Sequence, residues 1–188
     1  MKLTNKIITV CSIFLLSACS DGEPIDEGRI RGLNVSQVVN ETEFLYFINE
    51  QRGADRQCGE NSYIGIDEQL NLKPDLSEVS LSHGFDLIMS RTFSNFGSGT
   101  QYDDASPGDG NGSTLWNRVD YFNYKSDFVA ELIYKNVSKR DLPILAVDNW
   151  VEDNFSCKIL HNPKYKNIGL ATYKENNKFI YVATFSSD

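Results

Sequence analysis

The chain has 188 residues, and its 26 aspartates and glutamates outnumber its 18 lysines and arginines, which gives a formal net charge of −8. This length is sufficient for one domain with a hydrophobic core. The acidic balance argues against nucleic acid as a partner and against electrostatic docking to anionic lipid, because both carry negative charge.

The N-terminus has the pattern of an export signal. Lys2 and Lys6 precede an almost entirely apolar run over residues 7–16. This run has the length of a secretory signal core and is too short to cross about 30 Å of bilayer hydrocarbon as a permanent helix. The next residues, Leu-Ser-Ala-Cys ending at Cys19, resemble the lipobox of bacterial lipoproteins, in which the signal is cut before an acylated cysteine. The alternative is an ordinary signal peptide in which Cys19 is incidental.

An acylated Cys19 predicts a lipid-anchored protein of the bacterial cell envelope, with the membrane as its first partner. Each buried CH₂ group of an acyl chain contributes about 0.8 kcal/mol, so several chains would hold the protein firmly. Ser20, in place of an aspartate after the cysteine, favours the outer membrane over the inner one. We therefore divide the chain into a signal peptide at 1–18, a polar lipidated tether at 19–37 and one folded domain at 38–188.

The cysteine count predicts one disulfide. Cys11 would leave with the signal and Cys19 would be acylated, which leaves Cys58 and Cys157. Two cysteines in an exported chain are typical of a disulfide, and two separate thiols are the alternative.

Apolar periodicity and helix-boundary residues predict four helices in the domain. The first begins at Asn40, which is expected to form a capping box with Glu43. The last has Pro143 in its first turn, where a missing N–H is tolerated. A glycine-rich surface loop is predicted between the second and third helices. The expected helices lie at 40–53, about 75–91, 114–122 and from 138 or 141 to about 153, and the loop lies at 97–113.

The chain ends in a predicted β-hairpin with strands at 168–174 and 178–186. The second strand is apolar on both of its faces, and a strand buried on both faces requires a layer of structure on each side. The pattern therefore predicts an α/β fold with helices above and below a small sheet. The residues on the two faces are Phe179, Tyr181 and Phe185 on one, and Ile180 and Val182 on the other.

Six short segments between Phe44 and Phe185 form an ordered set. The first helix leads into NEQRGADRQC, the second into TFSNFGSG, and Arg118 precedes an Asn-Tyr pair. AELIY at 130–134, the segment from Trp150 to Pro163 and the hairpin IGLATY…FIYVATF follow. The set resembles the CAP superfamily of cysteine-rich secretory proteins, antigen 5 and pathogenesis-related proteins, and above all its bacterial secreted members.

The resemblance implies a three-layer α-β-α sandwich around a small central, largely antiparallel sheet. In the bacterial members that carry both cysteines, the one after the first helix pairs with the one in the penultimate segment, which implies the pair Cys58–Cys157. Other CAP proteins are associated with sterol or lipid binding, so the resemblance also suggests a lipid or peptide ligand.

Many CAP domains line a central cleft with two histidines and acidic residues that hold a divalent metal. On the alignment with this chain, the two histidine positions fall on Asn95 and Ser156, and only the glutamate is kept, as Glu131. Asparagine and serine are poor ligands for zinc or copper. We therefore expect no metal, no cofactor and a degenerate cleft formed by Asn95, Glu131 and Ser156.

The two histidines of the chain do not fill the vacant positions on this alignment. His83 lies within the second predicted helix and is expected to be a hydrogen-bonded core residue. His161 is expected at an exposed turn, with the rim of the cleft as the alternative. A hydrolase arrangement of Ser156, His161 and Asp153 would need its side chains to converge to about 3 Å, and nothing in the sequence places them so.

The segment from Asp103 to Ser113 contains Asp104, Asp109 and Asn111 among glycines. Oxygen ligands on a flexible backbone suit Ca²⁺. The segment lacks the regular ligand spacing and the distal glutamate of an EF-hand, so a solvated acidic loop is the favoured interpretation.

The favoured function is that of a non-catalytic envelope protein that binds a small amphiphile, a peptide or a partner protein through the degenerate cleft, with Glu131 as a hydrogen-bond acceptor. The alternative is a hydrolase that acts on peptide or envelope polymer through Ser156 or a water activated by Glu131. A third hypothesis is a structural lipoprotein without a ligand.

Overall fold

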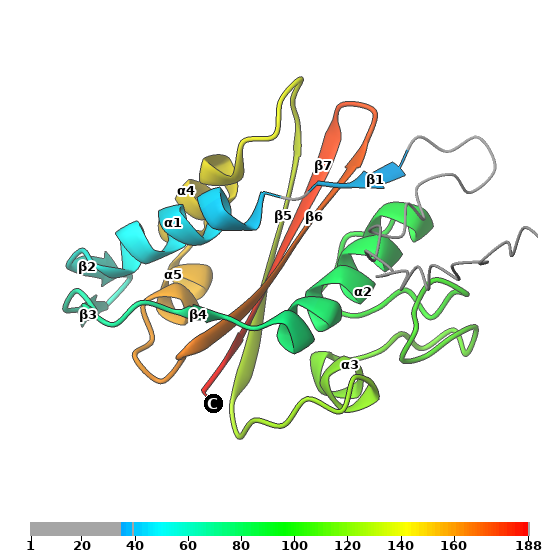
Figure 1. Ribbon diagram of the computed structural model, residues 1–188, viewed down its shortest axis with the longest axis horizontal. Helices are drawn as coiled ribbons and strands as arrows, with labels where there is room; N and C mark the ends of the chain where they lie inside the picture. The colour runs from blue at the N-terminus through cyan, green and yellow to red at the C-terminus, as the bar shows by residue number, and fades with distance from the viewer. Residues whose placement is uncertain (1–34, 39, 188) are drawn as a thin grey trace, which may run out of the picture.

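A computed structural model describes residues 35–38 and 40–187. Within these ranges the chain forms a central sheet with helices on both faces (Figure 1). The predicted signal peptide, Cys19 and most of the predicted tether lie outside the described residues. In the described part, no helix has the length and apolar character that a membrane span requires.

The sheet is built on three long strands, β5 (Val129–Val137), β6 (Asn167–Glu175) and β7 (Lys178–Ser186). Strand β7 lies in the centre and pairs antiparallel with β5 and with β6, over nine residue pairs each. At the outer edge of β6, β1 (Val35–Gln37) pairs antiparallel and β4 (Asn71–Leu72) pairs parallel. The predicted hairpin is confirmed, and the sheet is largely antiparallel.

The sheet begins earlier in the chain than the sequence indicates. Strand β1 starts at Val35, inside the range assigned to the tether, and Val35 packs in the apolar cluster that contains Ile180 and Val182. The ordered fold therefore includes at least three residues before the expected boundary at 38. A strand of three residues is too short to give a periodic signal, so only its pairing with β6 identifies it.

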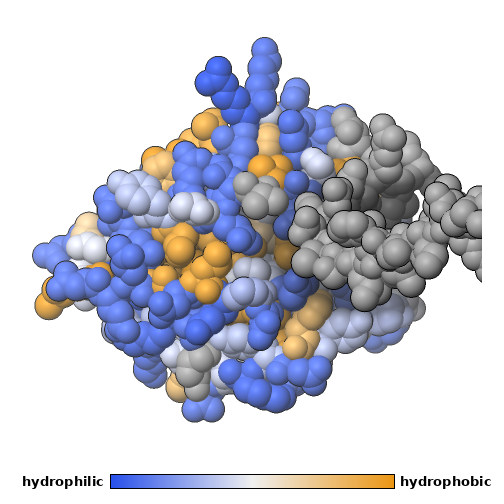
Figure 2. Space-filling model, viewed as in Figure 1, coloured by the Kyte–Doolittle hydropathy of each residue, from blue (hydrophilic) through white to orange (hydrophobic). Residues whose placement is uncertain are grey.

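One face of the sheet is covered by α1 (Glu41–Arg52), α4 (Pro143–Glu152) and α5 (Asn154–Leu160), as Figure 1 shows. Trp150 of α4 stacks on Phe44 of α1 with ring centroids 5.7 Å apart, and its indole N–H donates to the carbonyl of Ile133. Hydrophobic side chains gather around α1 and β4 on a face that is otherwise mostly hydrophilic (Figure 2). Here the core between α1 and the sheet approaches the surface. The fully buried members of this core are Phe44, Ile48, Ala146, Val147, Trp150, Leu160, Ile168, Leu170, Phe179, Tyr181, Ala183 and Phe185.

The opposite face is covered by α2 (Pro74–Ser90) and α3 (Leu115–Tyr121) (Figure 1). Helix α2 approaches β6 very closely at Gly169, where a Cβ atom would overlap the backbone of Leu76. The hydroxyl oxygen of Ser80 lies within hydrogen-bond distance of the Gly169 carbonyl oxygen (3.0 Å) and of Thr184 Oγ1 (2.7 Å), so the buried polar groups at this crossing are paired. Helices on both faces confirm the three-layer arrangement that the two apolar faces of β7 predict.

The predicted disulfide is present between Cys58 and Cys157, with the Cα atoms 5.6 Å apart. Cys58 ends β2 (Arg56–Cys58), which forms a small hairpin with β3 (Asn61–Tyr63), and Cys157 lies in α5. The bond therefore holds this hairpin against the last helix. It closes a loop with a sequence separation of 99, for which a chain-entropy model gives about 4–5 kcal/mol of stabilisation.

Two details of the helix ends differ from expectation. Asn40 precedes α1, but its side chain donates to the carboxylate of Glu43 (2.6 Å) and caps no backbone N–H, so the expected capping box does not form. The expected last helix ends at Glu152, because Asp153 adopts an extended conformation and its side chain accepts the backbone N–H of Ser156, which starts α5. Pro143 does lie in the first turn of α4.

We predict that Gly169→Ala lowers the free energy of unfolding by about 1–3 kcal/mol, because the added methyl group must push α2 away from β6. Urea unfolding measures the difference. Gly53→Ala is the matched control, since its Cβ would lie 3.5 Å from the nearest atom and its φ is −71°. Equal stability of the two variants would contradict the close approach.

Candidate functional site

The centre of the candidate site is a buried carboxylate, that of Glu131. Residues of β5 alternate between the two faces of the sheet, so Leu132 enters the core beneath α4 and Glu131 points towards α2 and α3. The Glu131 side chain is only 2% exposed. Its Oε1 atom lies 2.8 Å from Nη2 of Arg118 and 2.8 Å from Nδ1 of His83.

Arg118 joins three segments through its guanidinium. The side chain is 1% exposed and belongs to α3, whose first turn is closed by a capping box between Thr114 and Asn117. Besides Glu131, it donates to the carbonyl and hydroxyl oxygens of Ser113 and to the carbonyl oxygen of Asn95. A planar guanidinium with several donors can satisfy such a set at once, which an ammonium group does less well.

The charge of Glu131 is stabilised by these neighbours. Burial by itself raises the pKa of a carboxyl group, but the attraction of His83 and Arg118 and the contacts they make outweigh it. The pKa of Glu131 is therefore held below its ordinary value, and the group is a buried carboxylate at neutral pH. A cation that approached it would meet the positive charge of Arg118 2.8 Å from the same oxygen.

His83 is a core residue, as expected. It lies in α2 between buried residues and is fully buried. Its position on α2, which covers the sheet, brings Nδ1 to within 2.8 Å of the Glu131 carboxylate. This contact ties α2 to β5, but neither ring nitrogen of His83 has a hydrogen-bond partner among the described residues, so the expectation of a hydrogen-bonded histidine is not confirmed.

The glycine-rich loop is held by a buried aspartate. Asp103 is almost fully buried, and its Oδ2 atom accepts the backbone N–H groups of Gly99 (3.1 Å) and Ser113 (2.7 Å). Burial raises the pKa of this carboxyl group, and the hydrogen bonds from Ser113 and Gly99 lower it further than burial raises it. Asp103 therefore holds the two ends of the loop together and keeps Ser113 in position to accept hydrogen bonds from Arg118.

The same arrangement makes a calcium site in this loop a poor fit. Asp104 accepts a hydrogen bond from Ser82 of α2, and Asp109 turns outward to accept the N–H of Asn111. The carboxylates of Asp103 to Asp109 thus point to different partners and do not converge as a shared ligand set. Asp103 also differs from the expectation of a solvated acidic loop, because its side chain is buried and accepts hydrogen bonds from within the loop.

The expected cleft of Asn95, Glu131 and Ser156 is not assembled. Asn95 is exposed, and only its backbone carbonyl reaches the network, through Arg118. Ser156 lies in α5 on the other side of the sheet, where its hydroxyl donates to Asp153 (2.8 Å). The sequence alignment placed Ser156 by analogy, but the layer that a helix joins is decided by its packing, and α5 packs with α4.

His161 is buried, which corrects its expected place at an exposed turn. Its Nδ1 and Nε2 atoms each lie 3.0 Å from a backbone carbonyl oxygen, those of Cys157 and Gln51. Burial, together with the nearby Arg56 and Arg52, lowers its pKa despite these carbonyls. Both ring nitrogens face backbone carbonyls, so the hydrolase arrangement with Ser156 and Asp153 is not formed.

A search for three metal-compatible side chains in the described residues finds Cys58, Cys157 and His161, whose ligand atoms lie within 4.8 Å of one another. The two sulfur atoms are bonded to each other in the disulfide, and a metal ligand must be a thiolate. This group therefore does not fit a metal as it stands.

Sequence reasoning missed the pairing of Arg118 and His83 with Glu131. The position of Glu131 could have indicated this pairing. It lies among apolar residues in a strand, and a buried carboxylate requires a cation as its partner. Arg118 lies in a short helix beside the apolar Val119, which is the corresponding signal for a buried base.

No model of a known protein family matches the sequence, and neither does any curated protein. Among solved structures, an outer surface protein of Borrelia burgdorferi is 16% identical with a TM-score of 0.59, and the match covers 80% of this chain and 96% of that one. A match over nearly the whole of a second protein shows a shared fold. The chain shares its fold with this surface protein.

Two further matches carry CAP-related names. An extracellular protein containing an SCP domain from Bacillus anthracis is 20% identical with a TM-score of 0.48, and a cysteine-rich secretory protein from Staphylococcus aureus is 16% identical with a TM-score of 0.43. Each match covers 64% of this chain, and the chain spans about a third of either protein, 34% and 32%.

We predict that Glu131→Gln lowers the free energy of unfolding at pH 7 by about 3–5 kcal/mol, because it leaves Arg118 buried without its counter-charge. The pKa of Glu131 is lowered on folding, so its stabilisation is complete above the ordinary value of 4.5 and is lost as the pH falls through the lower folded value. Urea unfolding at a series of pH values from 7 to 3 should show a smaller acid-induced loss for the variant.

Glu78→Gln on the exposed side of α2 is the control for this measurement and should leave both the stability and its pH profile unchanged. A Glu131→Gln variant with the stability and the acid profile of the unmodified chain would contradict the role of the buried carboxylate.

Proposed function

We propose that this chain is an exported, lipid-anchored CAP-fold protein of the bacterial cell envelope that acts by binding and performs no catalysis. The observation that carries the proposal is the state of Glu131, whose carboxylate is buried and already engaged by Arg118 and His83. Of the three cleft positions in the family alignment, this is the only one that keeps a group able to bind a metal or to act as a base.

The residues present do not fit a divalent metal at this position. One histidine and one glutamate face each other, and a guanidinium occupies the place where a third ligand or a bound water would be needed. The two other alignment positions supply an exposed Asn95 and a Ser156 in a different layer. The same geometry argues against both forms of the hydrolase alternative. The hydroxyl of Ser156 donates to Asp153, and the carboxylate of Glu131, which would have to activate a water, is buried against Arg118.

Several features support export and anchoring. The Cys58–Cys157 disulfide is typical of chains that fold in an oxidising compartment outside the cytoplasm. The N-terminal sequence up to Cys19 resembles a lipoprotein signal. The Borrelia burgdorferi protein that shares the fold over almost its whole length is described as an outer surface protein. Placement in the outer membrane follows the sorting expected from Ser20.

We predict that the purified chain contains no stoichiometric zinc and shows no hydrolysis of ester, peptide or cell-wall substrates. Elemental analysis measures the metal, and chromogenic esters, peptides and purified cell-wall polymer serve as substrates. One zinc per chain that disappears in Glu131→Ala would overturn the proposal. So would hydrolysis that disappears in Ser156→Ala, a change that removes only a hydroxyl from the first turn of α5.

A second prediction concerns the anchor. In a bacterial host, the unmodified chain should be found in the membrane fraction, with a mass that shows an acylated N-terminal cysteine, and Cys19→Ser should move it to the soluble fraction. Cys11→Ser is the control, because this cysteine lies within the predicted signal and should leave the fractionation unchanged. A Cys19→Ser protein that stays in the membrane would contradict acylation at this residue.

A further inference from the structure

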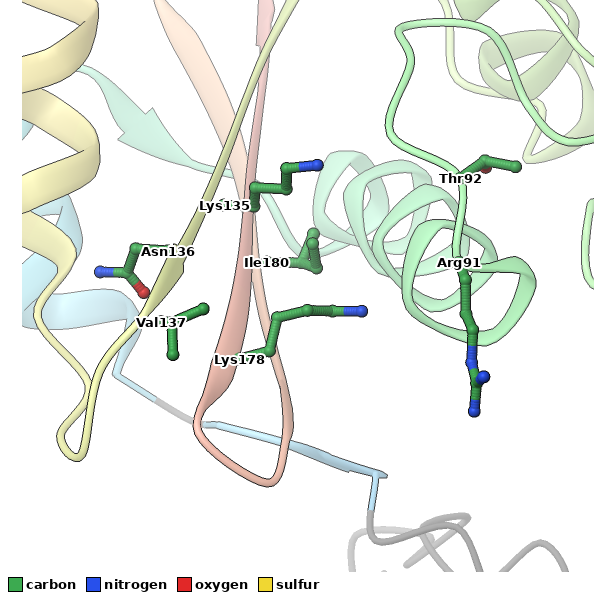
Figure 3. A pocket seen from close by; sticks show the side chains of 7 residues that line it. All are labelled: Arg91, Thr92, Lys135, Asn136, Val137, Lys178 and Ile180. Atoms are coloured by element: carbon green, nitrogen blue, oxygen red, sulfur yellow. The ribbon is translucent and has the colours of Figure 1, made fainter.

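A pocket of about 430 Å³ lies at the end of the sheet farthest from Glu131, where the C-terminal end of α2 meets β5 and β7. Figure 3 shows it from close by: Lys135, Lys178 and Ile180 extend from the strands towards the end of α2, where Arg91 and Thr92 lie. Its volume is in the range of small-ligand sites. The lining residues are Arg91, Thr92, Lys135, Asn136, Val137, Lys178 and Ile180.

The charge of this pocket is opposite to that of the whole chain. The chain has a net charge of −8, yet three of the lining side chains are cations. One carboxylate faces them: Glu175 lies 4.0 Å from Nη2 of Arg91 and 3.5 Å from Nζ of Lys178. Lys135 makes no ion pair with a described acidic residue. Three cations and one carboxylate leave a local charge of about +2 at neutral pH.

Arg91 occupies a backbone position that normally suits glycine or asparagine. It follows the last residue of α2 with φ 61°, in the left-handed region. A side chain at such a position adds strain that glycine would avoid, and strain of this kind is often found where a side chain has a use. Here the guanidinium is largely exposed and reaches the pocket.

The pocket also offers an apolar surface beside its cations. Ile180 forms the floor and is 1% exposed, whereas Val137 on the rim is 81% exposed. The ring of Phe93 lies under the Lys135 ammonium, 4.6 Å from Nζ to the ring centroid, and is itself partly exposed. A ligand that places a charge on the lysines can therefore place an apolar group against these side chains.

We infer that this pocket binds a phosphate monoester that carries an apolar group. A phosphate monoester has a charge of about −1.5 to −2 at pH 7, which matches the local charge of the pocket, and arginine and lysine side chains are its usual protein partners. The C-terminal end of a helix presents carbonyl groups and not N–H donors, so the anion depends on Arg91, Lys135 and Lys178. The inference rests on the proposed function in treating the chain as a binding protein, but it uses none of the residues around Glu131.

The test is calorimetric titration of the whole chain, in one non-ionic detergent throughout, with octyl phosphate, inorganic phosphate and dihexanoyl phosphatidic acid, which is a lipid phosphate monoester. Octyl phosphate should bind the unmodified chain, and the double variant Lys135→Gln/Lys178→Gln should weaken binding by at least about tenfold, the effect of losing charged hydrogen bonds. Lys139→Gln is the matched control, because Lys139 is an exposed lysine close by in sequence that does not line the pocket.

Val137→Ser tests the apolar surface of the pocket. It should weaken the binding of octyl phosphate and leave the binding of inorganic phosphate unchanged. If dihexanoyl phosphatidic acid also binds and loses affinity in the double variant, the source of the ligand is a lipid headgroup, and if it does not bind, the source is a soluble phosphate ester. No binding of octyl phosphate, equal binding of inorganic phosphate, or binding that the double variant leaves unchanged would overturn the inference. These outcomes are separate from the zinc and hydrolysis measurements, which test the proposed function itself.

Discussion

The carboxylate of Glu131, buried between the guanidinium of Arg118 and the imidazole of His83, is the interaction around which one side of this protein is arranged. It joins β5 to α2 and to α3, and through Arg118 it also holds Asn95 and Ser113 at the two ends of the long loop. A buried charge is costly unless it is paired, so each of these segments must be in place before the charge is compensated. The network therefore couples the order of the loop to the packing of the sheet.

The same network leaves the carboxylate of Glu131 poorly placed to bind a metal. Arg118 donates to the carboxylate oxygen that a metal ligand would need to offer, and the positions that are histidines in the family alignment are Asn95 and Ser156. The surface that remains suited to a ligand lies elsewhere, at the other end of β5, where cations and apolar side chains line the same pocket.

The parts of the structure that depend on local pattern were predictable. The two apolar faces of β7 indicated a layer on each side, the cysteine count indicated the Cys58–Cys157 bond, and periodicity located α1, α2 and α4. The parts that failed depend on contacts between distant residues. His161 was expected at an exposed turn, but the backbone carbonyls of Gln51 and Cys157 and the packing of the β2–β3 hairpin bury it.

By itself, the sequence determined the layers and the disulfide, because each follows from residue type and from spacing along the chain. Only the tertiary structure decided which face of the sheet each helix covers, and so placed Ser156 on the opposite side from Glu131. It also decided that Glu131 is neutralised from two helices, and that Arg91, Lys135 and Lys178 meet at one pocket. The physical reason is that pairing of charges depends on distance in space, and residues from different elements come within that distance only after the elements have packed.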